Sequence, residues 1–186
     1  MRIISGSAKG RRLATPSDRR IRPTADRVKE SLFNILAVQL GSWSDLRVLD
    51  LFAGTGNLGI EALSRGAAEA LFIDANREAA LLVKKNLEIA GLADRGRVLQ
   101  KEVLGALKSL KPTEPFGIVF IDPPYQQGLS GKVLEFLAAS ALIDEDSLIV
   151  AETAAKEDIP SRVGGLQKFD RRVYGDTVIH FFSLKP

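Results

Sequence analysis

The sequence predicts an α/β fold in which helices cover both faces of a mostly parallel, seven-stranded sheet. From residue 46 onward, short apolar segments alternate with segments that repeat hydrophobic residues at helical spacing. This alternation is typical of a doubly wound parallel sheet. Residues 169–184 instead read as two strands around a tight turn at Gly175-Asp176, which predicts a C-terminal antiparallel hairpin.

The N-terminal part predicts a small β-hairpin followed by the first helix. Residues 2–4 and 12–14 read as short strands around a glycine-containing turn at residues 6–10. We expect the helix to begin near Thr24, a suitable N-cap, with Asp26 in the first turn, where the helix dipole favours a negative charge. The apolar stripe of this helix consists of Val28, Leu32, Ile35 and Leu36.

The remaining elements follow in alternation along the chain. Strands are expected at residues 46–52, 70–74, 97–100, 118–122, 148–152, 169–174 and 177–184. Helices are expected at residues 58–64, 77–90, 103–110 and 132–141. Gly66 and Gly91 follow the first two of these helices, where glycine commonly ends a helix.

Size and composition limit the classes of function. A length of 186 residues with 45% hydrophobic content predicts one folded unit, with a catalytic domain at 24–186 and a small basic arm at 1–23. The chain has no cysteine and one histidine, which excludes disulfides and disfavours histidine-based metal sites and Ser-His-Asp triads. We interpret His180 as a strand side chain. Without a membrane-length apolar run or a signal-peptide core, a cytoplasmic protein is expected.

Positive charge is concentrated at the N-terminus. Residues 1–30 contain nine Lys or Arg against three Asp or Glu, a net charge of +6, while the rest carries −3. A basic arm on a mildly acidic body is expected of an enzyme that grips nucleic-acid phosphates with one segment. The alternative is a solvated tail that keeps the protein soluble. The candidate RNA-binding residues are Arg2, Lys9, Arg11, Arg12, Arg19, Arg20, Arg22 and Arg27.

The segment Asp122-Pro123-Pro124-Tyr125 follows an apolar strand and is the strongest chemical signal in the chain. In open α/β sheets, loops at the carboxyl ends of strands carry the chemistry. The carboxylate of Asp122 and the carbonyl of Pro123 can each accept an N–H of a flat exocyclic amino group. They would aim its lone pair at a methyl donor and stabilise the positive charge that develops. Tyr125 offers a stacking face for the base. The alternative is an ordinary strand-to-turn exit.

A glycine loop, Gly54-Thr55-Gly56-Asn57-Leu58-Gly59, follows the first strand of the alternating series, and Asp74 lies 20 residues after its first glycine. Taken alone, this pattern also fits a nicotinamide-binding protein. Asp50 favours S-adenosylmethionine, because an acid there suits a cationic amino group better than a pyrophosphate. The amino-group methylation motif and the antiparallel ending, which is expected of the methyltransferase sheet, favour the same cofactor.

Under this interpretation the loop glycines let the backbone approach the cofactor, Asp74 binds the ribose hydroxyls and Glu102 lies near the adenine. For Asp50, Asp74 and Glu102 the alternative is helix or turn capping. Gly59 is expected to serve close helix packing. The full set of candidate cofactor residues is Asp50, Ala53, Gly54, Thr55, Gly56, Asp74 and Glu102.

Nearly the whole chain resembles the bacterial RsmD-like family of 16S ribosomal RNA (guanine-N2)-methyltransferases. The resemblance rests on the N-terminal segment 1–11, on the segment from Arg22 to Asn34, on residues 49–67 around the glycine loop and on the Asp122 motif. The segment from Arg22 to Asn34 is the most particular of these. The resemblance implies a Rossmann-like class I methyltransferase fold and a monomer that uses S-adenosylmethionine, without a metal, on a guanine of the small ribosomal subunit.

Three alternatives remain open on the residues alone. The Asp122 motif does not name the base, so N6 of adenine in DNA or RNA is a second target. The glycine loop also permits a nicotinamide-dependent oxidoreductase, and a non-catalytic RNA-binding assembly protein would keep the same fold. Arg22, Thr24 and Arg27 could cover the cofactor, clamp RNA phosphate or simply cap and pair at one helix.

Overall fold

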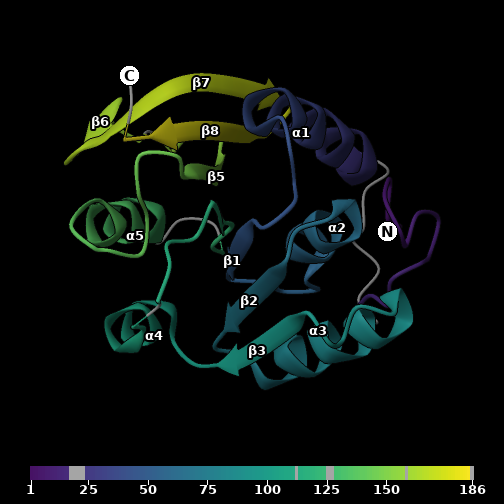
Figure 1. Cartoon of the computed structure of the whole chain (residues 1–186). Helices are drawn as coiled ribbons and strands as arrows, with labels where there is room; N and C mark the ends of the chain where they lie inside the picture. The colour runs from purple at the N-terminus through teal and green to yellow at the C-terminus, as the bar shows by residue number, and fades with distance from the viewer. Residues whose placement is uncertain (17–23, 112, 125–127, 158, 185–186) are drawn as a thin grey trace.

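The computed structural model describes residues 1–16, 24–111, 113–124, 128–157 and 159–184. These residues form three layers, a central sheet between two groups of helices (Figure 1). The helices are α1 (Thr24–Leu40), α2 (Asn57–Arg65), α3 (Arg77–Ala90), α4 (Val103–Ser109) and α5 (Leu129–Ala138). The strands are β1 (Arg47–Leu51), β2 (Glu69–Asp74), β3 (Gly96–Gln100), β4 (Ile118–Ile121), β5 (Leu148–Ala154), β6 (Arg162–Val163), β7 (Leu166–Tyr174) and β8 (Thr177–Ser183).

The sheet has eight strands in the order β3-β2-β1-β4-β5-β8-β7-β6. Strands β1 to β5 are parallel, and β8 lies antiparallel between β5 and β7. The predicted parallel sheet with an antiparallel ending is therefore confirmed. The prediction missed only the eighth strand, β6, whose two residues are too few to give a periodic pattern.

Helices α1, α2 and α3 cover one face of the sheet, and α4 and α5 cover the other (Figure 1). Successive strand residues alternate between these faces. Val48 and Phe120 belong to the core under α1, α2 and α3, whereas Leu49 and Val119 belong to the core under α4 and α5. Because both faces are buried, the central strands appear in the sequence as continuous apolar runs.

Residues 1–16 lie against α2 and α3 (Figure 1). The predicted N-terminal hairpin is reduced to a single antiparallel bridge between Arg2 and Arg12. Ile3 and Leu13 are only 1% and 5% exposed because they enter the core beneath the helices. Burial against α2 and α3, more than strand pairing, therefore fixes this segment.

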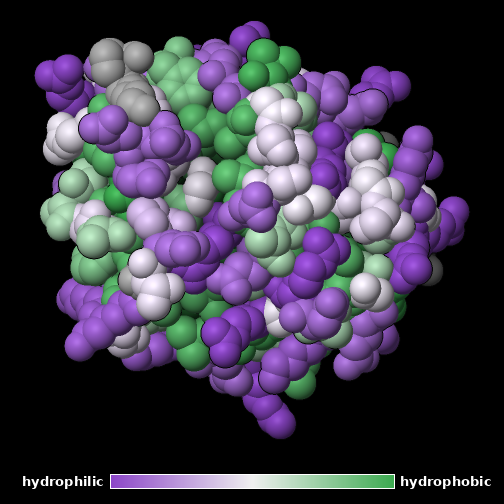
Figure 2. Space-filling model, in the orientation of Figure 1, coloured by the Kyte–Doolittle hydropathy of each residue, from purple (hydrophilic) through white to green (hydrophobic). Residues whose placement is uncertain are grey.

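Hydrophilic side chains dominate the molecular surface in the view of Figure 2, and hydrophobic ones occur between them in small groups. Within the described residues, no helix is long and apolar enough to cross a membrane. His180 is a buried strand residue of β8 whose Nε2 bonds to the Thr153 hydroxyl at 2.9 Å, as its position in an alternating segment predicted.

Candidate active site

Four acidic side chains collect at the carboxyl edge of the parallel strands. Asp74 ends β2, Asp50 lies near the end of β1, Asp122 directly follows β4 and Glu152 lies near the end of β5. The pairings Leu51↔Ile121 and Ile121↔Ala151 bring the strand ends level. The structure therefore brings Asp50, Asp74 and Asp122 to one edge, as the sequence predicted, and adds Glu152.

The glycine loop between β1 and α2 has an unusual backbone. Gly54 and Gly56 have φ values of 54° and 75°, in the left-handed region that favours glycine. Phe52 also has a positive φ, 59°, which is uncommon for a bulky residue and is found chiefly where a site requires a special backbone. A Cβ added at Gly54 would meet only the Phe52 carbonyl oxygen, at 3.9 Å, so the loop leaves room there for a ligand.

Asp50 is 2% exposed and its Oδ2 accepts the Gly59 backbone N–H at 2.9 Å. Burial raises the pKa of Asp50 to about 7; the Gly59 hydrogen bond opposes this shift and the charge of Asp74 adds to it. Burial makes the charged form of this carboxyl group unfavourable, and a cation that binds beside it would stabilise that form. The structure thus fits the expected contact with a cationic amino group.

Gly59 packs α2 onto the sheet, as expected. A Cβ at this position would come within 2.4 Å of Phe72 Cε1 and 3.0 Å of Asp50 Oδ2. Only glycine therefore lets the first turn of α2 reach Asp50, which places the backbone N–H of Gly59 against the carboxylate.

Asp74 and Glu102 both bond to backbone N–H groups. Asp74 Oδ2 accepts from Gly54 at 2.9 Å, which ties the end of β2 to the glycine loop. Glu102 caps α4, accepting from Leu104 at 2.9 Å and Gly105 at 2.6 Å. These bonds hold the pKa of the exposed Glu102 carboxyl below its usual value. Asp74 Oδ1 also accepts the Asn76 N–H at 2.8 Å, so both acids have the capping role weighed for them as an alternative, and Asp74 in addition shapes the glycine loop.

Asp122 is exposed at the end of β4 and Pro123 is buried beside it. Desolvation, and after it the charges of Glu152 and Asp50, raises the pKa of the Asp122 carboxyl well above its usual value. Because Asp122 is exposed, a substrate can reach it. Tyr125 lies outside the described residues.

Two residues that hold the glycine loop were not singled out from the sequence. The Asn86 side chain in α3 donates to the Thr55 carbonyl at 2.8 Å and also bonds to the backbone of Ala14. Lys29 of α1 donates to Asn57 Oδ1 at 2.7 Å, at the start of α2. Both contacts join segments that are far apart in the chain, so no local sequence pattern predicts them.

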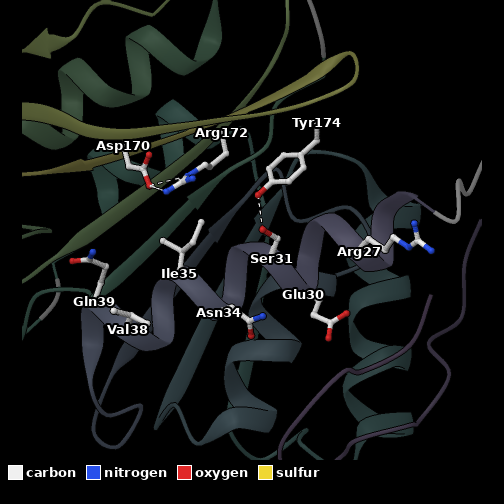
Figure 3. Close-up of a pocket in the computed structure, with 10 residues that line it drawn as sticks. All are labelled: Arg27, Glu30, Ser31, Asn34, Ile35, Val38, Gln39, Asp170, Arg172 and Tyr174. Atoms are coloured by element: carbon white, nitrogen blue, oxygen red, sulfur yellow. Dashed lines mark hydrogen bonds and ion pairs between the residues drawn. The ribbon is translucent and has the colours of Figure 1, made fainter.

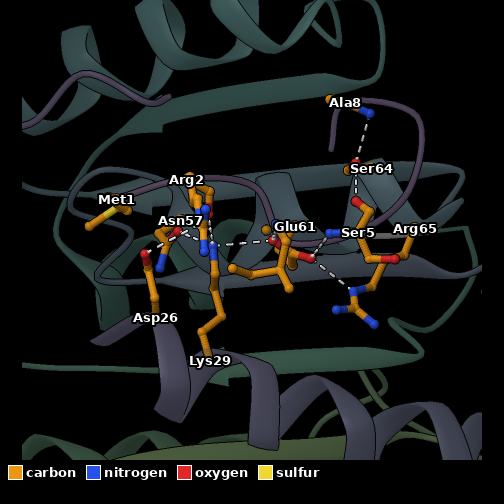
Figure 4. A network of polar contacts seen from close by, with 12 residues as sticks. Met1, Arg2, Ser5, Ala8, Asp26, Lys29, Asn57, Glu61, Ser64 and Arg65 are labelled. Atoms are coloured by element: carbon orange, nitrogen blue, oxygen red, sulfur yellow. Dashed lines mark hydrogen bonds and ion pairs between the residues drawn. The ribbon is translucent and has the colours of Figure 1, made fainter. Parts of the chain in front are cut away.

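Lys29 belongs to a buried polar network that also holds the N-terminal segment (Figure 4). Glu61 of α2 accepts the backbone N–H groups of Ile4 and Ser5 at 2.8 and 3.0 Å. Its carboxylate lies 3.2 Å from Lys29 Nζ and 2.9 Å from Arg65 Nε. Burial lowers the pKa of Lys29, and Glu61 counteracts part of that effect. The network links α1, α2 and the first residues of the chain.

The candidate RNA-binding residues differ in their surroundings. The five described candidates, Arg2, Lys9, Arg11, Arg12 and Arg27, are all exposed, but two of them also make contacts within the protein. Arg2 lies 3.9 Å from Asp26, and Arg11 donates to the Ile89 carbonyl at 2.9 Å. The remaining candidates, Arg19, Arg20 and Arg22, lie outside the described residues.

A groove of about 630 Å³ lies between α1 and β7, away from the glycine loop (Figure 3). Tyr174 and Ser31 bond across it at 2.6 Å, and Arg172 pairs with Asp170 at 2.9 Å. Arg27 and Glu30 lie at its rim. The strand-end carboxylates are not among the residues that line this groove.

The sheet order, the antiparallel β8 and the glycine loop beside strand-end acids define a Rossmann-like methyltransferase fold, and not the six-stranded parallel dinucleotide sheet. The family model described as "Conserved hypothetical protein 95" matches residues 1–183. The chain therefore belongs to this family, the RsmD-like family that its motifs resemble.

Known proteins agree with this assignment. Ribosomal RNA small subunit methyltransferase D of Escherichia coli K12 is 38% identical over 183 residues, which cover 98% of this chain and 89% of the relative. "Putative rRNA methyltransferase YlbH" of Bacillus subtilis is 38% identical over 184 residues, covering 98% of both chains. The solved structure "Putative methyltransferase yhhF from Escherichia coli" superposes with a TM-score of 0.82 at 34% identity, covering 98% of this chain and 97% of the other.

Proposed function

We propose that this protein transfers a methyl group from S-adenosylmethionine to the exocyclic N2 of one guanine in 16S ribosomal RNA. The observation that carries the proposal is the placement of Asp122 and Pro123 beside Asp50 and the glycine loop, at one edge of a methyltransferase sheet. The names of the relatives from Escherichia coli and Bacillus subtilis support ribosomal RNA as the substrate.

The residues around the loop fit the cofactor. Asp50 is placed to pair with its cationic amino group, and Gly54 allows the backbone to approach it. Asp74 can reorganise its bond to Gly54 and accept the ribose hydroxyls, while Glu102 marks the adenine side. When bound, S-adenosylmethionine supplies the methyl group and the positive charge that makes that group electrophilic.

Asp122 and Pro123 act on the nucleophile. An exocyclic amino nitrogen is a weak nucleophile because its lone pair is delocalised into the ring. The Asp122 carboxylate and the Pro123 carbonyl accept its two N–H groups, direct the lone pair at the methyl group and stabilise the developing positive charge. Direct displacement then gives the N2-methylated guanine and S-adenosylhomocysteine, and the methylated nitrogen is acidic enough to release its extra proton without a strong base. Neither a covalent enzyme intermediate nor a metal is needed. The base reaches this recess flipped from its stack, against Tyr125.

The exposed basic residues Lys9, Arg12 and Arg27 grip RNA phosphates, together with the other basic residues of the first 27 positions. The small ribosomal subunit or an assembly intermediate presents the target, and the protein acts as a monomer. The N-terminal segment then contacts RNA from the same side of the sheet on which α2 and α3 position the glycine loop.

The test is transfer of a labelled methyl group to small subunits that lack the modification, followed by digestion to nucleosides. We expect N2-methylguanosine at one position. N6-methyladenosine would instead support the adenine alternative, and RNA binding without any transfer would support a non-catalytic assembly protein. Stabilisation by NAD(P) but not by S-adenosylhomocysteine would support an oxidoreductase.

Asp122→Ala tests the assigned chemistry. Loss of this acceptor should lower kcat by about 10²–10³-fold, the range seen when one preorganised stabilising group is removed. Binding of S-adenosylhomocysteine should not change, because Asp122 acts on the base. Asp94→Ala, an exposed acid in the turn before β3, is the matched control and should retain full turnover. Full turnover by Asp122→Ala would overturn the assignment.

A further inference from the structure

Glu152 lies directly beside Asp122 at the edge where the base is proposed to bind. Strands β4 and β5 are parallel and in register up to Ile121↔Ala151, so Asp122, directly after β4, and Glu152, within β5, are the next residues in this register. The Asp122 N–H still donates to the Leu51 carbonyl of β1, at 3.4 Å, so the chain keeps the direction of the strand at this point. Neighbouring strands are about 4.8 Å apart. The two carboxyl groups are therefore within reach of one small planar ligand.

Strand alternation also places the two side chains on the same face of the sheet. Phe120 and Val150, two residues before each acid, both belong to the core under α1, α2 and α3. Side chains two residues apart on a strand point to the same face. Asp122 and Glu152 therefore both face the side of the sheet on which Asp50 of β1 meets α2 and the glycine loop. Glu152 is half-buried and Asp122 is accessible.

This arrangement is electrostatically costly without a ligand. Desolvation is the largest cause that raises the pKa of Asp122, and repulsion from Glu152 and Asp50 raises it further. A metal ion is not indicated, since no group of three or more His, Cys, Asp or Glu side chains in the described residues is placed to hold one. A ligand with two adjacent hydrogen-bond donors would relieve the repulsion instead.

Guanine and adenine differ in this respect. On its Watson–Crick edge, guanine presents N1–H and the N2 amino group side by side, so two donors face outward. Adenine presents an amino group beside N1, which carries a lone pair and no hydrogen. A carboxylate facing N1 therefore attracts guanine and repels adenine. A site built to bond a ligand N–H strongly rejects an analogue that lacks it, because its buried polar group is left unpaired.

We propose that Glu152 accepts the N1–H of the target guanine while Asp122 and the Pro123 carbonyl hold N2, which makes Glu152 the residue that selects guanine over adenine-like bases. This inference rests on the proposed function and adds the base-reading group. It also explains why a second acid lies beside the Asp-Pro-Pro motif, which does not by itself distinguish the two bases.

Glu152→Gln provides a discriminating test, because its amide can accept from guanine N1–H or donate to a bare N1. The matched pair of target bases is guanine and 2-aminopurine, which keeps the 2-amino group but has an unprotonated N1. The full-length protein is assayed on small subunits reconstituted with either base at the mapped position. The measured quantity is the ratio of kcat/KM for guanine to that for 2-aminopurine.

We expect the wild-type protein to prefer guanine strongly and Glu152→Gln to lower the ratio by about 10–100-fold, the discrimination typical of one good base contact. The pH–rate profile of Glu152→Gln on guanine should also move to lower pH, because Asp122 loses a repelling neighbour. Asp176→Asn, an exposed acid in the β7–β8 turn, should change neither quantity.

The two kcat/KM values of this ratio are measured on the same variant. A smaller folded fraction therefore lowers both values equally and leaves the ratio unchanged. An unchanged ratio would overturn the role of Glu152 while leaving guanine methylation intact. Loss of methylation of both guanine and 2-aminopurine by Glu152→Gln, with unchanged S-adenosylhomocysteine binding, would also overturn this role, because the glutamine amide retains a hydrogen-bond acceptor. Absence of guanine methylation by the wild-type protein would instead refute the proposed function.

Discussion

Asp50 is a buried carboxyl group whose surroundings suit the cationic ligand proposed for it. It is almost fully removed from water, and one backbone N–H from Gly59 is the hydrogen bond that the described residues provide. Burial, opposed by that bond, raises the pKa of Asp50 to about 7. Without ligand the group is therefore largely protonated below neutral pH, and it must ionise to pair with a cation.

This pKa predicts the pH dependence of cofactor binding. As pH falls below about 7, Asp50 gains a proton, and the affinity for S-adenosylhomocysteine should fall by up to tenfold per pH unit. As pH rises above 7, the affinity should level off. Titration calorimetry between pH 5 and 8.5 measures this. Asp50→Asn should bind weakly at every pH, and a wild-type affinity that is flat with pH would contradict the assigned role.

Gly59→Ala should disturb the same carboxylate by crowding. The added methyl would come within 2.4 Å of Phe72 and 3.0 Å of Asp50 Oδ2, so α2 or the ring must move. We expect a loss of about 1–3 kcal/mol in the free energy of unfolding, together with weaker S-adenosylhomocysteine binding. Gly131→Ala in α5 is the control. Its methyl would meet nothing within 4 Å, and it should stabilise the helix by about 0.5–1 kcal/mol. Denaturant unfolding of both variants checks the contrast.

At the scale of elements, the N-terminal segment is anchored by the buried charges of α1 and α2. Glu61 bonds the backbone of Ile4 and Ser5 and neutralises Lys29, which in turn holds Asn57 beside the glycine loop. A buried pair of this kind costs desolvation, so its value lies in fixing three segments relative to one another. The same side chains therefore hold both the basic N-terminal segment and the glycine loop in position.

Glu61→Gln should break this anchor. The positive charge of Lys29 would lose its buried partner, and we expect a loss of about 3–5 kcal/mol in the free energy of unfolding. Burial lowers the pKa of Lys29 and Glu61 raises it, so removal of the Glu61 charge should lower this pKa further. The folded variant then releases the Lys29 proton at lower pH than the folded wild type, so the loss should shrink as pH rises toward 9.

Denaturant unfolding at pH 7 and 9 and hydrogen exchange of residues 1–16 measure these effects. Glu69→Gln, which removes the accessible partner of Arg47, is the control and should cost less than about 1 kcal/mol. Equal losses for the two variants would show that Glu61 is not an anchor.

At the scale of the whole molecule, charge is divided between a basic N-terminal region and a mildly acidic remainder. Residues 1–16 lie on the side of the sheet where α2 and α3 position the glycine loop (Figure 1). An electrostatic grip on RNA there would orient the catalytic edge toward the substrate without reading its sequence. In the proposed function, base selection is then the role of the carboxylates at the strand ends.

The salt dependence of binding tests this division. Binding of small subunits by the double variant Lys9→Ala/Arg12→Ala should show a slope of log affinity against log salt that is shallower by about one for each charge removed. Lys108→Ala, on α4 across the sheet, is the control and should leave the slope unchanged. Filter binding at several salt concentrations gives the slopes, and equal slopes for all three proteins would exclude the N-terminal grip.

Much of the fold was predictable because its signals are local. The alternating apolar and helical periods located every strand from β1 to β5 and the β7–β8 hairpin, and glycines marked where α2 and α3 end. Two elements differ from the prediction. Helix α5 begins at Leu129, three residues earlier than expected, and the N-terminal hairpin forms only one bridge because Ile3 and Leu13 are buried against helices.

The sequence by itself determined which residues lie at the strand ends, since Asp50, the glycine loop and Asp122-Pro123 are each contiguous with a strand. Only the tertiary structure decided which groups face one another. Glu152 adjoins Asp122 because β5 pairs with β4, and Lys29 reaches Asn57 because α1 packs beside α2. Such neighbours depend on the order of strands and the packing of helices, which arise from contacts between residues distant in the chain and not from local periodicity.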